Sequence, residues 1–179
     1  MFLNTTASEN TAVGSYALDA NTDGAYNTAV GANSMTKNTG GDYNVAMGYL
    51  AMEENTTANR NVAIGAYSLQ ETTTGSQNTA IGGWAMQNNS TASNNTAVGY
   101  YALQGNTTGT YNVAVGHQAL DANTTGDYNV ALGYSALTTN TTTNSNTAIG
   151  YQTLKECQGA KNVAVGTQAG LSITTGVEN

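Results

Sequence analysis

Side chains that could carry out acid–base or metal chemistry are few and scattered in this sequence. Its 179 residues include a single histidine, His117, and a single cysteine, Cys157. The one adjacent acidic pair is Glu53–Glu54, and neighbouring residues of a strand point to opposite faces, so these carboxylates are not expected to act together. Glycoside cleavage needs two carboxylates about 5–9.5 Å apart, and nothing in the pattern holds Asp42 and Asp127 at that distance. We therefore predict that the chain is not an enzyme and that it uses no metal or other cofactor.

A short motif that recurs at a fixed interval must position every other side chain. The motif reads Asn, Thr or Val, Ala, a medium aliphatic residue and Gly, and residues 112–116 are one copy. It occurs ten times, with its asparagines 17 residues apart except for a final interval of 16. A fixed period of this length is typical of a solenoid, in which each coil buries its apolar face on the next. Residues at the same position of successive repeats should then form columns along a rod.

The motif alternates with the two-residue period of a β-strand. A helix is disfavoured because every repeat contains glycine, which costs about 1 kcal/mol per site relative to alanine. We predict an all-β fold, a parallel β-roll or β-solenoid of about ten coils that forms one domain over residues 1–179. The chain starts and stops inside a repeat, so we expect it to be a segment of a longer fibre.

The motif also predicts what each column does. Val115 and its equivalents should fill the coil interior against the Leu120 column, which ends a second short strand. The invariant alanine, Ala114, should then point to the opposite face and approach a partner chain. Gly116 should form a corner with a positive φ or a close backbone approach. Asn112 and its equivalents should stack as an amide ladder, as should a second asparagine column later in the repeat.

The composition of the chain limits the classes of partner that it can bind. Only 8% of the residues are charged and the net charge is −7. The four basic residues, Lys37, Arg60, Lys155 and Lys161, are scattered, which excludes the clustered basic surface that nucleic acid needs. No apolar run is long enough to insert into a membrane. Cys157 lies in the one shortened repeat, where we predict a buried thiol, with a contact between chains as the alternative.

Two columns directly after the motif glycine hold the candidate binding residues. The seventh column contains Leu50, Tyr67, Trp84 and Tyr101, and the sixth contains Tyr100, His117, Tyr134 and Tyr151. Aromatic side chains on an exposed ladder could contact sugar rings or a protein receptor. In the alternative interpretation the rings stack on one another or pack between chains, which contributes about 0.5–1.5 kcal/mol per pair.

The runs Asn-Thr-Ala-Val-Gly, Asn-Val-Ala-Ile-Gly and Asn-Thr-Ala-Ile-Gly resemble the head repeat of trimeric autotransporter adhesins. Together with the Asn-Thr-Thr-Gly segments they also resemble repeats of phage tail fibres and related surface fibres. The resemblance covers essentially the whole chain. It implies a left-handed parallel β-roll, three chains side by side around a threefold axis, and attachment to a host surface. The adhesin repeat is shorter, so the Asn-Thr-Thr-Gly loop is expected to be extended here.

We therefore expect a structural and adhesive fibre segment, either a tail or capsid fibre of a virion or an adhesin head on a bacterial surface, and in both cases extracellular. Its expected partners are further copies of itself and a host surface glycan or protein receptor. The alternative function is an ice-binding β-solenoid that presents arrays of threonine. The two functions differ in where the threonine columns lie, on a flat exposed strand or in a curved loop.

Overall fold

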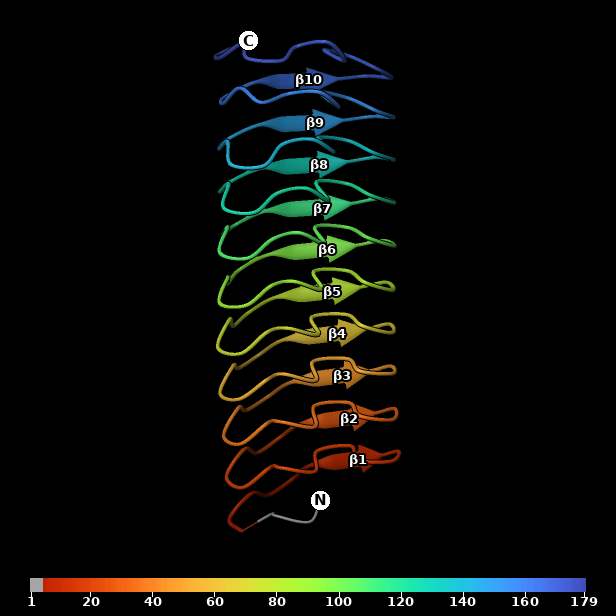
Figure 1. The fold of residues 1–179 in the computed structure, drawn as a ribbon, viewed down its shortest axis with the longest axis vertical. Helices are drawn as coiled ribbons and strands as arrows, with labels where there is room; N and C mark the ends of the chain where they lie inside the picture. The colour runs from red at the N-terminus through yellow and green to blue at the C-terminus, as the bar shows by residue number, and fades with distance from the viewer. Residues whose placement is uncertain (1–4) are drawn as a thin grey trace.

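One short strand from each repeat builds a single parallel sheet. The computed structural model describes residues 5–179, and within this range the strands pair in chain order, with each motif residue beside its equivalent in the next coil (Figure 1). The strands are β1 (Thr11–Val13), β2 (Thr28–Val30), β3 (Val45–Met47), β4 (Val62–Ile64), β5 (Thr79–Ile81), β6 (Thr96–Val98), β7 (Val113–Val115), β8 (Val130–Leu132), β9 (Thr147–Ile149) and β10 (Val163–Val165). The predicted all-β parallel solenoid is confirmed.

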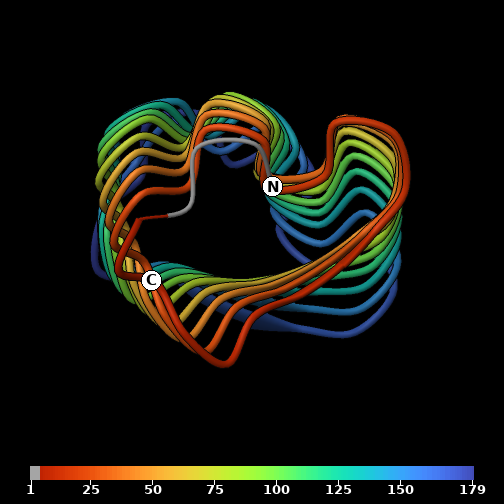
Figure 2. The same cartoon turned by 90° about the horizontal axis from the view of Figure 1, so that it is seen from below.

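The coils stack into a rod. Its two ends are the two ends of the described chain, and seen along its length the coils nearly superimpose with a small progressive rotation (Figures 1 and 2). Neighbouring strands of a sheet lie about 4.8 Å apart, so ten of them span roughly 50 Å. Each column of equivalent side chains therefore runs nearly straight along the rod.

The interior of each coil is filled by the motif alanine and by the Leu or Met of the opposite wall. Ala114 and Leu120 are fully buried, whereas Val115 is only half-buried. The alanines of β2–β9 have no exposed surface, but the aliphatic side chains beside them are exposed by 37% at Ile64 and by 43% at Leu132. The predicted interior contact between the Val115 and Leu120 columns is therefore wrong. The prediction that Ala114 faces a partner chain is wrong for the same reason.

The width of the coil explains this reversal. Leu120 and a second buried alanine, Ala119, come from the wall opposite the strand and belong to the same core as Ala114. They leave room for little more than a methyl group on the inner face of the strand. Alternation along the strand then sends the larger side chains outward. The sequence could not distinguish the two faces, because both are apolar.

The segment after the motif glycine is a turn, so the predicted second strand is wrong. In the coil of β7, Gln118 and Leu120 have left-handed φ angles of 55° and 54°, and Tyr128, which ends that repeat, has a φ of 58°. The turn still bonds to the next coil, since the Leu120 N–H donates to the Ala136 carbonyl oxygen at 2.9 Å. Such bonds between coils hold non-glycine residues in a conformation that costs roughly 1–2 kcal/mol each.

The predicted glycine corner is confirmed. Gly116 has a φ of 134°. A Cβ atom at this residue would lie only 2.5 Å from the carbonyl oxygen of Gly133 in the next coil. Both the backbone angle and the close approach of the coils therefore require glycine here.

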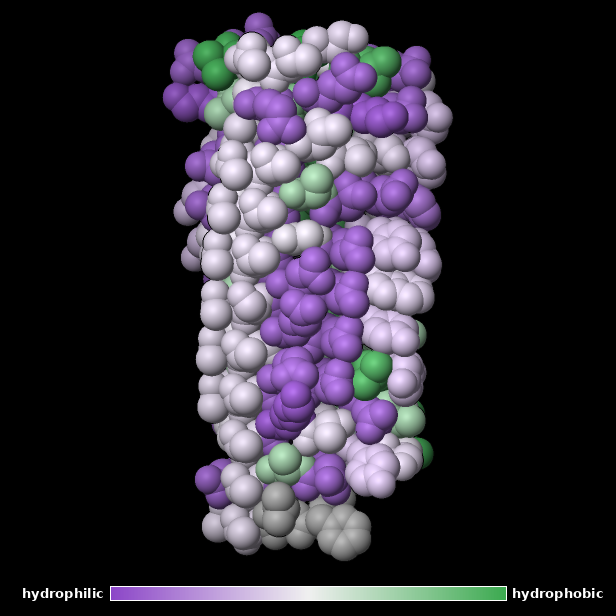
Figure 3. All heavy atoms as spheres, in the orientation of Figure 1, coloured by the Kyte–Doolittle hydropathy of each residue, from purple (hydrophilic) through white to green (hydrophobic). Residues whose placement is uncertain are grey.

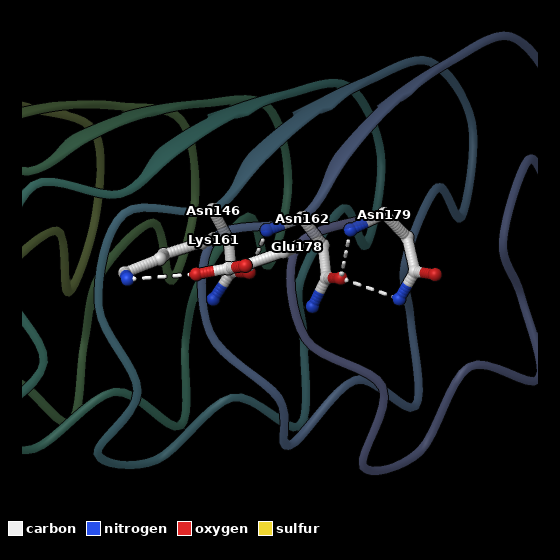
Figure 4. Close-up of polar contacts among 5 residues, drawn as sticks. All are labelled: Asn146, Lys161, Asn162, Glu178 and Asn179. Atoms are coloured by element: carbon white, nitrogen blue, oxygen red, sulfur yellow. Dashed lines mark hydrogen bonds and ion pairs between the residues drawn. The ribbon is translucent and has the colours of Figure 1, made fainter.

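The motif asparagines link the coils. Asn112 Oδ1 accepts a hydrogen bond from the Asn129 backbone N–H at 2.9 Å, and Asn112 Nδ2 donates to the Gly126 carbonyl oxygen at 2.8 Å. Figure 4 shows the same column near the C-terminal end, where Asn162 Oδ1 accepts from the backbone and side-chain nitrogens of Asn179 at 3.2 and 2.9 Å. Burying these amides is tolerable because they are paired.

The second asparagine column is bonded from amide to amide. Asn123 Nδ2 donates to Asn106 Oδ1 at 2.8 Å and to the Gly126 carbonyl oxygen of its own turn at 3.0 Å. Both predicted asparagine ladders are therefore present, although the first works mainly through the backbone.

Cys157 replaces an asparagine of the second column in the shortened repeat. It is fully buried, and its Sγ lies 3.5 Å from both the Gly159 carbonyl oxygen and Asn162 Nδ2. The predicted buried thiol is confirmed. A side chain without exposed surface is not placed to contact another chain, which disfavours the alternative.

Candidate binding surfaces

The part of the chain that the structure describes offers open surface rather than an enclosed site. Residues 5–179 form no pocket, and they contain no group of three or more His, Cys, Asp or Glu side chains that could hold a metal ion. None of these segments is a helix with the length and apolar character needed to cross a membrane. A binding site within this range therefore depends on which side chains the columns bring together on the outside of the rod.

The predicted aromatic residues gather into one strip, which we call the aromatic lane. Its members are Tyr49, Tyr67, Trp84, Tyr100, Tyr101, His117, Tyr134 and Tyr151. The lane runs without interruption from the coil of β3 to the coil of β9. Leu50, also predicted as a binding residue, is half-buried at the start of the lane and contributes no ring. Tyr49 was not among the predicted residues, although extending the sixth column to the coil of β3 would have found it.

Most rings in the same column lie nearly parallel, and the exception is Trp84–Tyr101, which is inclined by 39°. Tyr67 and Trp84 in the seventh column are inclined by 16°, with their centroids 4.9 Å apart. His117 and Tyr134 in the sixth column are inclined by 8°, with their centroids 5.2 Å apart. Contacts of this kind stabilise a fold by about 0.5–1.5 kcal/mol per pair. The stacked rings therefore contribute to the stability of the fold, independently of any role in binding.

Rings in different columns lie close to perpendicular. The angle is 90° between Tyr49 and Tyr67. It is 67° between Trp84 and Tyr100, and 74° between Tyr100 and Tyr101. The ring planes therefore turn by a large angle where the lane passes from one column to the other.

The lane is mostly a single ring wide. A coil with a ring in the seventh column has a small residue in the sixth, as in Ala66–Tyr67 and Gly83–Trp84. Within the lane, only the coil of β6 carries rings in both columns. A Cβ atom at Gly83 would lie 3.3 Å from Tyr100 Cδ2, so Tyr100 leans over this glycine. Small neighbours thus let the line of rings pass from one column to the other.

The lane is uncharged, and a polar ladder lies near it. The sixth and seventh columns together contain no Asp, Glu, Lys or Arg. In the tenth column, Gln104 donates to Gln87 at 2.9 Å and Gln87 donates to Gln70 at 3.0 Å, both through their amide groups. Figure 3 shows a hydrophilic stripe along the middle part of one face of the rod, beside a paler column.

Asp121 continues the tenth column, and its surroundings disfavour the ionised form of its carboxyl group. Burial raises the pKa of its carboxyl group, while hydrogen bonds from the backbone N–H groups of Ala122 and Asp121 and the nearby His117 act in the opposite direction. Asp121 Oδ1 is buried without a hydrogen-bond donor. Thr138 in the same column donates its hydroxyl to the carbonyl oxygen of Gln118 in the seventh column at 3.4 Å, so the tenth column lies beside the lane.

A second set of tyrosines, at the last position of the repeat, was not predicted. Tyr26 and Tyr43 stack with centroids 4.8 Å apart, and Tyr111 and Tyr128 stack at 5.2 Å. The guanidinium of Arg60 lies 5.7 Å from the Tyr43 ring centroid. All four rings are exposed. Sorting the residue before each motif asparagine by column would have revealed them.

The outward side chains of the strands form an aliphatic surface, which we call the outer sheet face. It consists of the second and fourth motif positions of β1–β10, which are Thr or Val and Val, Ile, Met or Leu. Met47 is exposed by 41% and Leu132 by 43%. No position of this face carries a formal charge. Contiguous apolar surfaces of this extent are typical of interaction sites.

The threonines of the Asn-Thr-Thr-Gly segments lie in bends between the strands. The first threonine of each segment is engaged between coils, as when Thr107 Oγ1 donates to the Thr124 carbonyl oxygen at 3.0 Å. The second threonine, such as Thr108 or Thr125, is exposed. The columns therefore leave a single exposed row of threonine in a curved part of the coil.

The column geometry determines the architecture without reference to any relative. The chain is a parallel β-solenoid. Its coils are about 17 residues long, and the described residues contain no helix. Comparisons with protein-family models, curated proteins and solved structures find no match. What the rod does must therefore be argued from its surfaces.

Proposed function

We propose that this chain is a structural and adhesive segment of an extracellular fibre, in which several copies pack side by side. Three copies is the number that the resemblance to adhesin heads and tail fibres favours. The setting is a tail or capsid fibre of a virion or an adhesin on a bacterial surface. The fibre attaches to a glycan or a protein receptor on a host or other surface.

The outer sheet face is the observation that carries this proposal. The chain has a net charge of −7, so copies that meet through charged surfaces would repel one another. The outer sheet face is uncharged and aliphatic, and it offers the apolar contact that association requires. Met47 and Leu132 remain more than 40% exposed in a single chain, and packing against another copy would remove this surface from water.

The size of the face is adequate for such packing. Ten strands about 4.8 Å apart and three residues of about 3.3 Å each give a plane of roughly 500 Å². A standard interface buries about 800 Å² per partner. The exposed tyrosines beside the strands, such as Tyr26 and Tyr111, would supply the remaining area.

Two measurements test the proposal. Native mass spectrometry or light scattering at micromolar concentration should give an assembly of a few chains, with a trimer as the expected mass. A fluorescently labelled sample should attach to bacterial or host cells. A stable monomer would contradict the assembly, and absence of attachment across a broad set of surfaces would contradict the adhesive role.

Ice binding is the alternative function, and the contacts favour it less. An ice-binding surface needs a flat array of free hydroxyl groups. The hydroxyls of Thr56 and Thr107 donate to carbonyl oxygens of the next coil, and the exposed row beside them lies in a bend. On the flat strands, threonine alternates irregularly with valine at the second motif position. Measurable thermal hysteresis would nevertheless establish this function.

A further inference from the structure

We propose that the aromatic lane binds an uncharged, extended polysaccharide that lies along the rod axis. This inference rests on the proposed adhesive function, for which it names the chemical class of the ligand. It is carried by three features of the lane, namely its lack of charge, its exposed rings and its repeat along the rod.

The lack of charge selects the class of ligand. The sixth and seventh columns carry no Lys or Arg in any coil, so nothing in them would pair with the carboxylate or sulfate groups of an anionic glycan. Asp121 belongs to the tenth column, in which Thr138 bonds to Gln118 of the seventh column at 3.4 Å. Glu53 accepts a hydrogen bond from Gln70 in the same tenth column. These carboxyl groups would repel an anionic chain. A neutral glycan would contact the aromatic rings and the glutamine amides without electrostatic repulsion.

The ring geometry supplies the two kinds of contact that a sugar makes. Part of the aromatic surface of the lane is exposed to solvent and can receive the C–H groups of a sugar ring. Tyr100, Tyr134 and Tyr151 are exposed by 42%, 46% and 48%. Tyrosine offers a hydroxyl as well as an apolar ring, so it can also bond to sugar hydroxyls.

The repeat along the rod matches an extended polymer. Lane members of successive coils follow one another with centroid separations between 4.9 and 5.7 Å. A sugar ring with its glycosidic linkage is similar in length to the rise of a single coil, so successive sugars can meet successive rings. The described surface has no pocket, hence each sugar gains little and the affinity accumulates with chain length. Parallel copies of the rod would increase it further through avidity.

The centre of the proposed site is the place where the line of rings changes from the seventh to the sixth column. Trp84 stacks on Tyr67, meets the edge of Tyr100 at a centroid distance of 5.3 Å, and lies 5.5 Å from Tyr101 with the two rings inclined by 39°. Trp84 is also the only tryptophan of the chain. Its fluorescence therefore reports on this place and no other.

Titration of the whole chain with cellohexaose, chitohexaose and mannohexaose, followed by Trp84 emission, tests the inference. We expect a saturable change with at least one of these neutral glycans and at least tenfold weaker binding of the corresponding trisaccharide. Hyaluronan and polygalacturonate should bind more weakly than the neutral glycan. The inference is overturned if no neutral glycan changes the emission, or if an anionic glycan binds more strongly.

A matched pair of variants locates the site. Tyr134→Ala removes a lane ring, and Tyr128→Ala removes an exposed, stacked ring outside the lane, at the end of the preceding repeat. Tyr134→Ala should weaken binding of the long glycan by about tenfold, whereas Tyr128→Ala should leave it unchanged. Equal effects of the two variants would place the ligand elsewhere.

Attachment of labelled protein to cells separates this inference from the proposed function. If the wild type attaches and Tyr134→Ala attaches less, both stand. If both attach equally, or if protease treatment of the target cells abolishes attachment, the chain is adhesive but the lane is not its glycan site. If the wild type attaches to no surface, the adhesive function itself fails, whereas glycan binding in solution would still establish the site.

Discussion

Asn55 Oδ1 lies buried without a hydrogen-bond donor, because Thr72 occupies the next place in the asparagine ladder. Thr72 donates its hydroxyl to the Asn89 carbonyl oxygen at 2.9 Å, so it has no hydrogen left for Asn55. On the other side the ladder is intact, since Asn55 Nδ2 donates to Asn38 Oδ1. The amide column is thus interrupted after Asn55, as it is after Asn123, whose Oδ1 atom also lacks a donor.

Thr72→Asn should repair the ladder and stabilise the protein. The new amide would donate to Asn55 Oδ1 and accept from Asn89, and satisfying a buried polar atom is worth about 1 kcal/mol. Thermal or denaturant unfolding should show this as a higher midpoint. Thr74→Asn, at an exposed site in the same turn, is the control and should change stability little. Equal effects of the two substitutions would show that the ladder is not the cause.

A pair of leucines tests which column fills the coil. Leu120 is fully buried, and Leu132, on the outer sheet face, is 43% exposed. Leu120→Ala should cost about 2–5 kcal/mol of unfolding free energy, the usual range for a buried leucine. Leu132→Ala should cost much less, provided that unfolding is measured at concentrations where the chains are single. A cost for Leu132→Ala as large as that for Leu120→Ala would restore the interior assignment that the sequence suggested.

The sequence predicted the features that depend on the period and missed those that depend on the neighbouring coil. The period alone placed Asn112 in a ladder and Gly116 at a corner. It could not decide between Ala114 and Val115 for the interior, because that choice depends on the width of the coil. The left-handed φ of Leu120 was also out of reach, because its cause is a bond to Ala136 and not a local preference.

The same distinction applies to the candidate binding surfaces. Assigning residues to columns was enough to align Trp84 with Tyr67 and Tyr101. The perpendicular setting of Tyr100 could not be predicted, because it follows from the packing of its ring over Gly83. The absence of charge from the lane and from the outer sheet face was predictable, because aligning the repeats shows which columns contain no charged residue.

Two glycines separate backbone strain from the lack of a side chain. Gly116 has a φ of 134°, and a Cβ atom there would meet the Gly133 carbonyl oxygen at 2.5 Å, whereas nothing lies within 4 Å of a Cβ atom at Gly40. Gly116→Ala should destabilise the rod by about 3 kcal/mol or more, or prevent folding, because both strain and a clash arise. Gly40→Ala should be neutral or stabilise by about 0.4–1 kcal/mol, since it restricts only the unfolded chain. Circular dichroism during thermal unfolding would measure both effects, and a destabilised Gly40→Ala protein would refute this account.

Charges placed on the outer sheet face should block assembly without unfolding the coil. Ile64 and Ile81 point outward from β4 and β5 and are exposed by 37% and 38%, so lysine at both sites remains solvated in a single chain. In a packed assembly the same lysines would be buried without partners, at a cost of several kcal/mol. The double variant Ile64→Lys/Ile81→Lys should therefore run as a monomer in light scattering, with the circular dichroism of the wild type.

The control for this experiment adds the same charge away from the outer sheet face. Thr57 and Thr74 lie in the exposed bends of nearby coils, so Thr57→Lys/Thr74→Lys changes the net charge equally and should still assemble. If both double variants dissociate, net charge rather than the outer sheet face governs assembly. If neither dissociates, the copies meet elsewhere.

Asp121 should make stability depend on pH in the direction opposite to that of a salt-bridged carboxylate. Burial raises the pKa of this group above its ordinary value of 3.8. Once the carboxyl is ionised in both the folded and the unfolded chain, the folded state bears the cost of desolvation, so Asp121 destabilises the rod at neutral pH. That cost falls as the pH drops through the raised folded value, and it is absent below the unfolded value, where both states are protonated.

Asp121→Asn should therefore raise the unfolding midpoint at neutral pH, and the gain over wild type should shrink toward zero as the pH falls below about 4. Because the side chain is only half-buried and solvent screens it, the gain should stay below about 1 kcal/mol. Glu71→Gln, at an exposed site, is the control for the general loss of negative charge. A gain for Asp121→Asn that persists undiminished in acid would assign the effect to the unpaired Oδ1 atom and not to the ionisation of the carboxyl group.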